Sequence, residues 1–450
     1  MAADTATGAP SDATRREHVV VVGGGFGGLA TARRLTDRSN PEIPVDVTLI
    51  DRRNHHTFQP LLYQVATAGL QAQDIGVSLR ATLRHRGVRV RLGDVVGVDT
   101  EAHEIELDGG ERIGYDRLVL AAGAVTQDLG IEGVAEHAFE LKSIPDATRV
   151  RNHVLRRFEA ASADPARQDD GTLSFVVAGG GPTGVELVGM LAELTQVVLR
   201  RDYPEIDRSR VRIVLVELLD RLLPGFSERS GEEALDKLRQ RRIDVRLGVG
   251  IAKAEADHVE LTDGEVIPTE TLLWAAGISA SPLADALGVE LGPGRRVPVD
   301  GRLRVQDVAD VYAIGDVAAA FDGDGEPLPQ LAAVAIQQGK YLGKAIGQEL
   351  AGTRPRPFRY RDKGVMATIG RGDAVAELPG GVYLRGVTAW LAWLALHLLL
   401  LVGFKNRVDV LGSWLWNYAT FDQAERLIVD QHEPERTRET YGPVERSALG

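Results

Sequence analysis

The strand and glycine turn at residues 19–28 constrain the fold more than any other segment. Four consecutive valines favour a parallel strand buried on both faces. The turn that follows holds three glycines at the spacing that allows a close approach to a pyrophosphate and to the strand: Gly23, Gly25 and Gly28. A helical period, a strand over 45–50 and Asp51 come next, and Asp51 is placed to accept hydrogen bonds from a ribose. The alternative is a purely structural βα turn, but the complete pattern favours a dinucleotide site.

The same pattern occurs a second time in the chain. A strand over 174–178 leads into a second turn, which consists of Gly179, Gly180, Gly181, Pro182, Thr183 and Gly184. A helix from Val185 and a strand over 211–216 follow, and that strand ends in Glu217. The buried strands that close the two halves also match, because each runs into an Ala-Ala-Gly turn, at Ala121–Gly123 and at Ala275–Gly277. This duplication predicts an α/β fold with two Rossmann-like dinucleotide-binding domains.

The acid that follows the second repeat indicates which dinucleotide binds there. Glu217 would accept from both ribose hydroxyls of NADH and would repel the 2′-phosphate of NADPH. Its neighbours Leu218 and Leu219 offer no phosphate clamp, and Arg221 is the one nearby cation. We therefore expect NADH at the second turn, so that one cofactor stays bound while the other exchanges.

The residue types that are missing exclude several classes of protein. The chain has no cysteine, so it contains no disulfide framework, thiolate metal site, cysteine-ligated iron–sulfur cluster or redox-active dithiol. Electron transfer would have to use bound organic cofactors. A net charge of -12 argues against a nucleic-acid partner. The adjacent pair His55–His56 has no further ligands nearby in sequence, so no metal site is expected.

Other segments carry weaker patterns. Residues 1–17 are small and polar without the apolar core of a signal peptide, which favours a disordered leader on a cytoplasmic protein. Alternating runs over 88–107 predict a β-meander. The strand over 311–316 ends in Asp316, which could hydrogen-bond a ribityl chain, and helix formers over 317–320 predict a helix behind it.

Glu186 admits two interpretations. It lies in the first turn of the second glycine-turn helix, where a carboxylate complements the helix dipole. The alternative is that Glu186 points into a cleft between domains and contacts the nicotinamide or a proton path.

These motifs together resemble the type II NADH dehydrogenases, within the flavoproteins that bind two dinucleotides. The more specific matches are 54–70, 363–370 and the Gln337–Gly339 segment. The resemblance implies FAD at Gly23, Gly25, Phe26, Gly28, Asp51, Arg52, Gln59, Ala122, Gly123 and Asp316. It implies NADH at Gly179, Gly181, Pro182, Thr183, Gly184, Glu217 and Gly277. It also implies a catalytic role for Gln337, which matches the second of a glutamine pair beside quinone and flavin, whereas Ala333 replaces the first. From its position after the second turn, Glu186 is the other predicted catalytic residue.

The segment 387–404 is apolar and uncharged, and Lys405 and Arg407 follow it. Eighteen residues span only ~27 Å as a helix, against a ~30 Å hydrocarbon core. Interfacial helices with Trp and Tyr at headgroup level therefore fit better than a span. A buried core or dimer hairpin is the alternative. Four of the five tryptophans lie in this tail: Trp390, Trp393, Trp414 and Trp416.

We therefore expect an FAD-dependent NADH:quinone oxidoreductase that transfers hydride from NADH to FAD and then two electrons to a membrane quinone of the menaquinone or ubiquinone class, without pumping protons. The expected state is a peripheral homodimer on the cytoplasmic face of the cell membrane. A soluble ferredoxin-type reductase and a low-turnover flavin redox sensor are the alternatives. The predicted divisions are a leader (1–17), a split FAD domain (18–135 and 278–360), an NADH domain (136–277) and a membrane-docking region (361–450).

Overall fold

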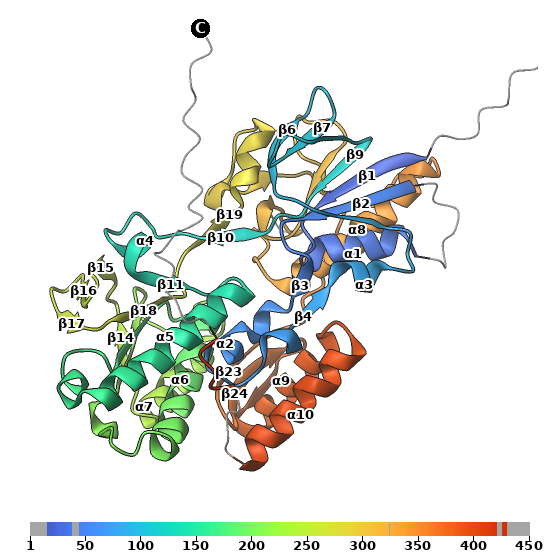
Figure 1. The fold of residues 1–450 in the computed structure, drawn as a ribbon. Helices are drawn as coiled ribbons and strands as arrows, with labels where there is room; N and C mark the ends of the chain where they lie inside the picture. Colours follow the sequence, from blue (N-terminus) through green and yellow to red (C-terminus); the bar gives the residue numbers. More distant parts are fainter. Residues whose placement is uncertain (1–15, 38–44, 324, 421–424, 430–450) are drawn as a thin grey trace, which may run out of the picture. The chain divides into compact units, whose positions relative to one another are not determined.

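A computed structural model describes residues 16–37, 45–323, 325–420 and 425–429 (Figure 1). Most of the predicted leader lies outside these ranges. Residue contacts divide the chain into two compact units. Unit 1 comprises 1–56, 78–124 and 279–361, and unit 2 comprises 57–77, 125–278 and 362–450. The α/β fold with parallel sheets is confirmed, whereas the predicted functional divisions stay predictions.

Unit 1 contains a five-stranded parallel sheet in the order β21-β9-β1-β2-β5. Helices α1 and α8 pack together so closely that a Cβ on Gly339 of α8 would lie 2.3 Å from the carbonyl oxygen of Gly27 in α1. The bounds are β1 Glu17–Val22, α1 Phe26–Leu35, β2 Val45–Asp51, α3 Leu79–Leu83, β5 Arg89–Leu92, β9 Arg117–Leu120, β21 Val311–Ala313 and α8 Ala332–Leu350.

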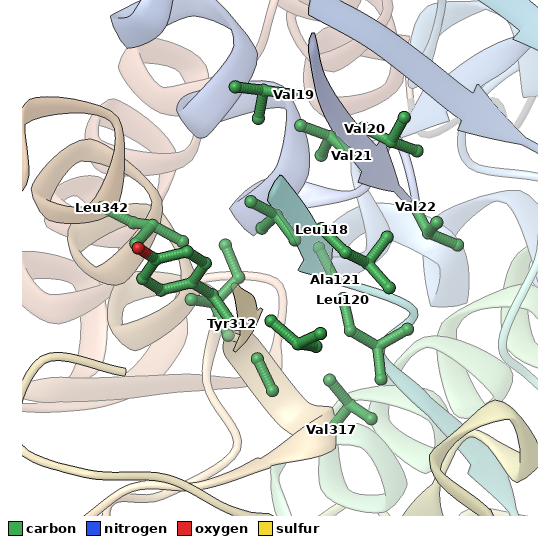
Figure 2. Packing of buried hydrophobic residues seen from close by; sticks show 14 of the residues in the cluster. Val19, Val20, Val21, Val22, Leu118, Leu120, Ala121, Tyr312, Val317 and Leu342 are labelled. Atoms are coloured by element: carbon green, nitrogen blue, oxygen red, sulfur yellow. The ribbon is translucent and has the colours of Figure 1, made fainter. Parts of the chain in front are cut away.

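The valine run predicted as a buried parallel strand is β1. It pairs in register with β2 along one edge and β9 along the other, and the valines that point to its two faces are all buried. Figure 2 shows these valines clustered with side chains that include Leu118, Tyr312 and Leu342. The sheet is therefore a rigid support for the turn that follows β1.

Two sequence predictions in unit 1 are wrong. The first strand of the predicted 88–107 meander, β5, instead pairs in parallel with β2 as the edge of the main sheet. The antiparallel meander consists of β6 Val95–Asp99, β7 Glu104–Leu107 and β8 Arg112–Gly114. The helix predicted over 317–320 does not form, because a 3₁₀ turn at Gly315–Val317 leads into the short strand β22 Ala318–Ala319, which pairs with β20 Val297–Pro298.

Unit 2 repeats the arrangement with a parallel sheet in the order β11-β18-β12-β13-β14. The bounds of this part are β11 Ala138–Glu140, α5 Ile144–Ala163, β12 Ser174–Ala178, α6 Pro182–Arg201, β13 Arg212–Glu217, α7 Glu228–Gln240, β14 Asp244–Leu247 and β18 Thr271–Trp274. An antiparallel meander follows β14, formed by β15 Ile251–Ala254, β16 His258–Leu261 and β17 Val266–Pro268.

The last part of unit 2 is an antiparallel sheet followed by two helices, drawn in orange and red in Figure 1. A Cβ on Gly189 of α6 would lie 2.4 Å from the carbonyl oxygen of Ile369, so α6 packs directly on this sheet. Among the described residues, no helix has both the length and the hydropathy that crossing a bilayer requires. The bounds are α2 Leu62–Ala66, β23 Val365–Gly370, β24 Asp373–Leu378, β25 Val382–Arg385, α9 Gly386–Leu400 and α10 Phe404–Thr420.

Candidate functional site

The turn between β1 and α1 has the geometry that its three glycines predict. Gly23 has a φ of 103°, which a residue with a side chain rarely adopts. A Cβ on Gly28 would lie 1.9 Å from the Gly23 carbonyl oxygen, so only glycine allows the helix to start this close to the strand. Gly25 has no atom within 4 Å of its Cβ position, so the turn is open there. An open turn at a helix N-terminus fits a pyrophosphate.

Asp51 ends β2 and holds the middle of this turn. Its Oδ2 accepts from the backbone N–H of Gly24 at 2.6 Å, and its Oδ1 accepts from the N–H of Arg53 at 2.6 Å. Burial raises the pKa of Asp51, and the two backbone donors oppose that shift. The neighbouring side chain of Arg52 is exposed. The carboxylate is therefore fixed at the end of the strand, where the predicted ribose would lie.

The turn of unit 2 has nearly the same geometry. Gly179 has a φ of 107°, and a Cβ on Gly184 would lie 1.8 Å from the Gly179 carbonyl oxygen. Gly181 has open space at its Cβ position, and the exposed residues Pro182 and Thr183 begin α6. The turn therefore offers a second open helix N-terminus.

Glu217 ends β13 and takes the place that Asp51 has in unit 1. Its carboxylate accepts from the backbone N–H of Gly180 and, at 2.8 Å, from that of Leu219. The guanidinium of Arg221 donates to the carbonyl oxygen of Pro224 at 2.6 Å. Arg221 is thus engaged with its own loop, which agrees with a site that lacks a clamp for a 2′-phosphate.

The other predicted flavin residues of unit 1 lie in two turns. Ala122 and Gly123 follow β9, and Gly123 has a φ of 71° with open space at its Cβ position. Two glutamines hold the turn that contains Asp316. Gln338 of α8 accepts from the Gly315 N–H at 2.6 Å, and Gln330, which precedes α8, donates to the Asp316 carbonyl at 2.9 Å. Gln338 lies in the 337–339 match, but the sequence did not predict that these two glutamines hold the Asp316 turn.

Gln337, the predicted catalytic glutamine, lies one residue before Gln338 and makes different contacts. Its amide donates to the Arg361 carbonyl at 2.9 Å and accepts from the Arg361 N–H at 3.1 Å. Both polar atoms are therefore engaged with one backbone residue. Ala333 lies in the first turn of the same helix, α8.

Glu186 is buried within unit 2, where it contacts β23. The Thr368 N–H donates to its Oε1 at 3.3 Å, and burial raises the pKa of Glu186 to about 8. The Trp393 indole N–H lies close enough to Glu186 to oppose the pKa shift that burial produces. Glu186 therefore lies in a dry environment rather than simply complementing a helix dipole in water.

A chain of hydrogen bonds leads from this carboxyl group to α10. Tyr63 and Thr368 share a hydroxyl contact of 3.1 Å, and Gln64 donates to the Tyr63 hydroxyl at 3.0 Å. The Trp414 indole donates to Gln64 Oε1 at 2.8 Å. No local sequence pattern predicts this network, because its members come from four separate elements.

Two further predicted residues lie in unit 2. Gln59 begins a 3₁₀ helix over Gln59–Leu61, is exposed, and donates to the Lys142 carbonyl at 3.2 Å. Gly277 follows β18 with a φ of 67°.

Within the described part of the chain, no three His, Cys, Asp or Glu side chains gather as a metal site would require.

Comparison with known proteins shows the family to which the chain belongs. Residues 17–339 match the family model described as pyridine nucleotide-disulphide oxidoreductase, and residues 363–419 match the NDH2 C-terminal domain. The chain is 38% identical over 441 residues to the type II NADH:quinone oxidoreductase Ndh of Mycobacterium tuberculosis, covering 94% of this chain and 93% of that protein. It is 36% identical over 427 residues to NdhA of the same organism, covering 91% and 88%. The chain belongs to the type II NADH:quinone oxidoreductases.

The structure of NDH2 from Plasmodium falciparum in complex with NADH has the same fold, with a TM-score of 0.82 at 21% identity, covering 92% of this chain and all of that one. The two open turns fit the two dinucleotide cofactors of this class, FAD and NADH. Because the chain lacks cysteine, it cannot use the dithiol chemistry that the broader family name describes.

Proposed function

We infer that this chain oxidises NADH and reduces a quinone, with FAD bound in unit 1 and NADH bound in unit 2. The single observation that carries the inference is the presence of two open glycine turns of matching geometry, each with an acid at the end of the next strand. FAD, when bound, supplies the group that accepts hydride and gives up electrons one or two at a time. The absence of cysteine leaves a diffusible acceptor such as a quinone as the electron outlet.

The residues of the chain bind and orient the cofactors. The turn at Gly23–Gly28 would hold the FAD pyrophosphate, Asp51 would accept from the ribose, and Asp316 would face the ribityl chain. In unit 2 the turn at Gly179–Gly184 would hold the NADH pyrophosphate, and Glu217 would accept from the ribose hydroxyls and exclude NADPH.

Glu186 would supply a proton, which quinone reduction consumes. A pKa of about 8 keeps the carboxyl group mostly protonated at neutral pH. Oε1 accepts from the Thr368 N–H, so a proton carried on Oε2 would leave that hydrogen bond intact. Gln337 would act beside the acceptor, as the family resemblance implies.

We propose that α9 and α10 dock the protein on a membrane surface. The exposed apolar residues of α10 recur at helical spacing, and the side chain of Phe404 is 82% exposed. The opposite side of the helix pair is buried, with Trp393 and Trp414 only 1% and 3% exposed. The prediction that these two tryptophans lie at headgroup level is therefore wrong, because they fall on the inward faces of their helices. The exposed apolar set is Val387, Leu391, Leu396, Leu399, Leu400, Phe404, Val408, Leu411, Leu415 and Trp416.

The cytoplasmic side of the membrane and a homodimeric state complete the proposal. The family resemblance implies the homodimer, and the composition of residues 1–17 favours the cytoplasmic side. Sedimentation in detergent measures the dimer, and protease access in oriented membrane vesicles measures the side.

Flavin absorbance tests the redox function. The purified protein is reduced anaerobically with NADH, and a soluble quinone is then added. Rapid bleaching followed by rapid recovery is expected. Bleaching without recovery would contradict quinone reduction and favour a ferredoxin-type reductase or a redox sensor.

Flotation with liposomes tests the docking surface. Replacing Phe404 and Leu415 with Glu should release the protein from liposomes, because both side chains leave the water when the helix enters the interface. Phe321→Glu is a matched control, since Phe321 is also exposed but lies in unit 1. Equal flotation of the double variant and the control would overturn docking through α10.

A further inference from the structure

The backbone N–H and carbonyl oxygen of Gly24, in the middle of the unit 1 turn, each contact a side chain. Asp51 accepts from its N–H, and His56 lies 3.0 Å from its carbonyl oxygen through Nδ1. Because a carbonyl oxygen only accepts, the His56 Nδ1 must carry the hydrogen and donate it. In the neutral ring Nε2 is then unprotonated, and Nε2 has no hydrogen-bond partner among the described residues.

The surroundings of His56 keep the ring neutral and immobile. Its side chain is 2% exposed, and burial lowers the pKa of His56 to about 4. The ring meets Phe26, the first residue of α1, edge to face with centroids 4.9 Å apart. Leu79 covers the turn from another side, since a Cβ on Gly24 would lie 2.6 Å from its Cδ1.

Unit 2 holds the corresponding carbonyl in another way. The Gly180 carbonyl accepts from the backbone N–H of Leu223 at 2.8 Å, and Leu223 adopts a φ of 52°. Leu222 covers Gly180 as Leu79 covers Gly24. The carbonyl of the second turn is therefore held by a backbone donor, whereas the corresponding carbonyl of the first turn depends on a side chain.

We propose that His56 is a positioning residue for FAD, whose Nδ1–H fixes the Gly24 carbonyl and so keeps the turn open at Gly25 for the pyrophosphate. The inference rests on the proposed placement of FAD in unit 1. It assigns to His56 a role in cofactor retention that has no counterpart side chain at the NADH turn.

Three variants of the full chain separate the contributions of the ring. His56→Asn places an amide N–H where Nδ1 lies, His56→Gln places one where Nε2 lies, and His56→Phe keeps the ring packing without any donor. Each protein is stripped of flavin, and FAD affinity is measured by quenching of flavin fluorescence. NADH affinity of the same preparations, measured by nucleotide fluorescence, reports on unit 2.

His56→Asn should bind FAD within about threefold of the wild type, and His56→Gln and His56→Phe should lose about tenfold or more, because a buried carbonyl loses its donor. NADH affinity should stay unchanged in all three. Wild-type affinity in His56→Phe, a better result for Gln than for Asn, or equal losses in Asn and Phe would each overturn the proposal. A wild-type protein that binds no FAD would instead overturn the proposed function.

The tautomer is read from the wild-type protein, and a variant serves only to assign its signal. In ¹⁵N spectra of histidine side chains, the signal lost in His56→Asn, or in His56→Phe if Asn does not fold, should be a neutral ring protonated at Nδ1. A neutral ring protonated at Nε2 would overturn the proposal, because Nδ1 would then have no hydrogen to donate.

Discussion

The two glycine turns share a backbone geometry and differ in what surrounds it. In both, the first glycine (Gly23 or Gly179) has a strongly positive φ, and its carbonyl lies against the last glycine of the turn. An acid accepts from the N–H of the residue after the first glycine, Gly24 or Gly180. Two residues after the last glycine, however, unit 1 has Ala30, which packs against Gly339 of α8, and unit 2 has Glu186, which contacts Thr368. Recognition of a dinucleotide therefore fixes the turn, while the next helical position serves packing in unit 1 and, in unit 2, holds the buried carboxyl group that we propose supplies a proton.

The largest expected effect comes from breaking the shared geometry itself. Gly28→Ala and Gly184→Ala should each cost at least ~3 kcal/mol, because the new Cβ would overlap a backbone carbonyl that cannot move aside. The first should release FAD and the second should abolish NADH binding. Urea unfolding, flavin content and nucleotide fluorescence measure these changes. Gly25→Ala and Gly181→Ala are matched controls with open space, and a comparable loss of stability in them would contradict this account.

The second effect isolates the residue at which the units differ. Burial raises the pKa of Glu186 from 4.5 to about 8, so its contribution to stability is complete below pH 4.5 and is lost as the pH rises toward 8. The free energy of unfolding should fall by up to ~1.4 kcal/mol per pH unit in that window. Glu186→Gln should therefore match the wild type near pH 4.5 and exceed it at pH 8, as measured by thermal unfolding. A difference that does not change with pH would show that the carboxyl group is not held neutral.

The third effect tests the acids separately. Glu217→Ala should raise the KM for NADH about tenfold to a hundredfold, since a ribose acceptor is lost and two backbone N–H groups lose their partner. FAD content should not change. Asp51→Asn should do the reverse and weaken FAD while leaving NADH binding intact. Steady-state kinetics and flavin content distinguish the two, and an unchanged KM in Glu217→Ala would remove the assignment of NADH to unit 2.

The smallest effect concerns the hydrogen bonds that connect Tyr63 and Gln64 to Trp414 of α10 in unit 2. Trp414→Phe keeps the ring but removes the donor to Gln64, so it should cost ~1 kcal/mol. Thermal unfolding measures the change. Trp416→Phe is the control, because Trp416 is exposed on the same helix and should leave the melting temperature unchanged. Equal shifts in both variants would show that the buried hydrogen bond contributes nothing specific.

The sequence predicted what periodicity and glycine spacing control and missed what depends on contacts between distant segments. The strand, turn, helix and acid of both repeats could be located because each is a local pattern. The short run at 317–320 favours a helix by composition, yet pairing with β20 makes it a strand. The inward positions of Trp393 and Trp414 depend on packing within unit 2, which the apolar composition of the tail does not reveal. His56 stood out as half of a weak metal motif and within the 54–70 match, but its contact with Gly24 was not predicted, because a helix and a strand separate the two residues in sequence.

Both units are assembled from three separate stretches of chain, and this has a consequence for synthesis. The sheet of unit 1 needs β21 beside β9, so a nascent chain cannot complete that sheet until Val311–Ala313 has left the ribosome. Unit 2 likewise waits for β23 to cover α6. Most of the polypeptide must therefore emerge before either unit can close, and the apolar helices α9 and α10 emerge after β21 and β23. The surface proposed to meet the membrane is thus among the last described parts of the protein to be exposed in the cell.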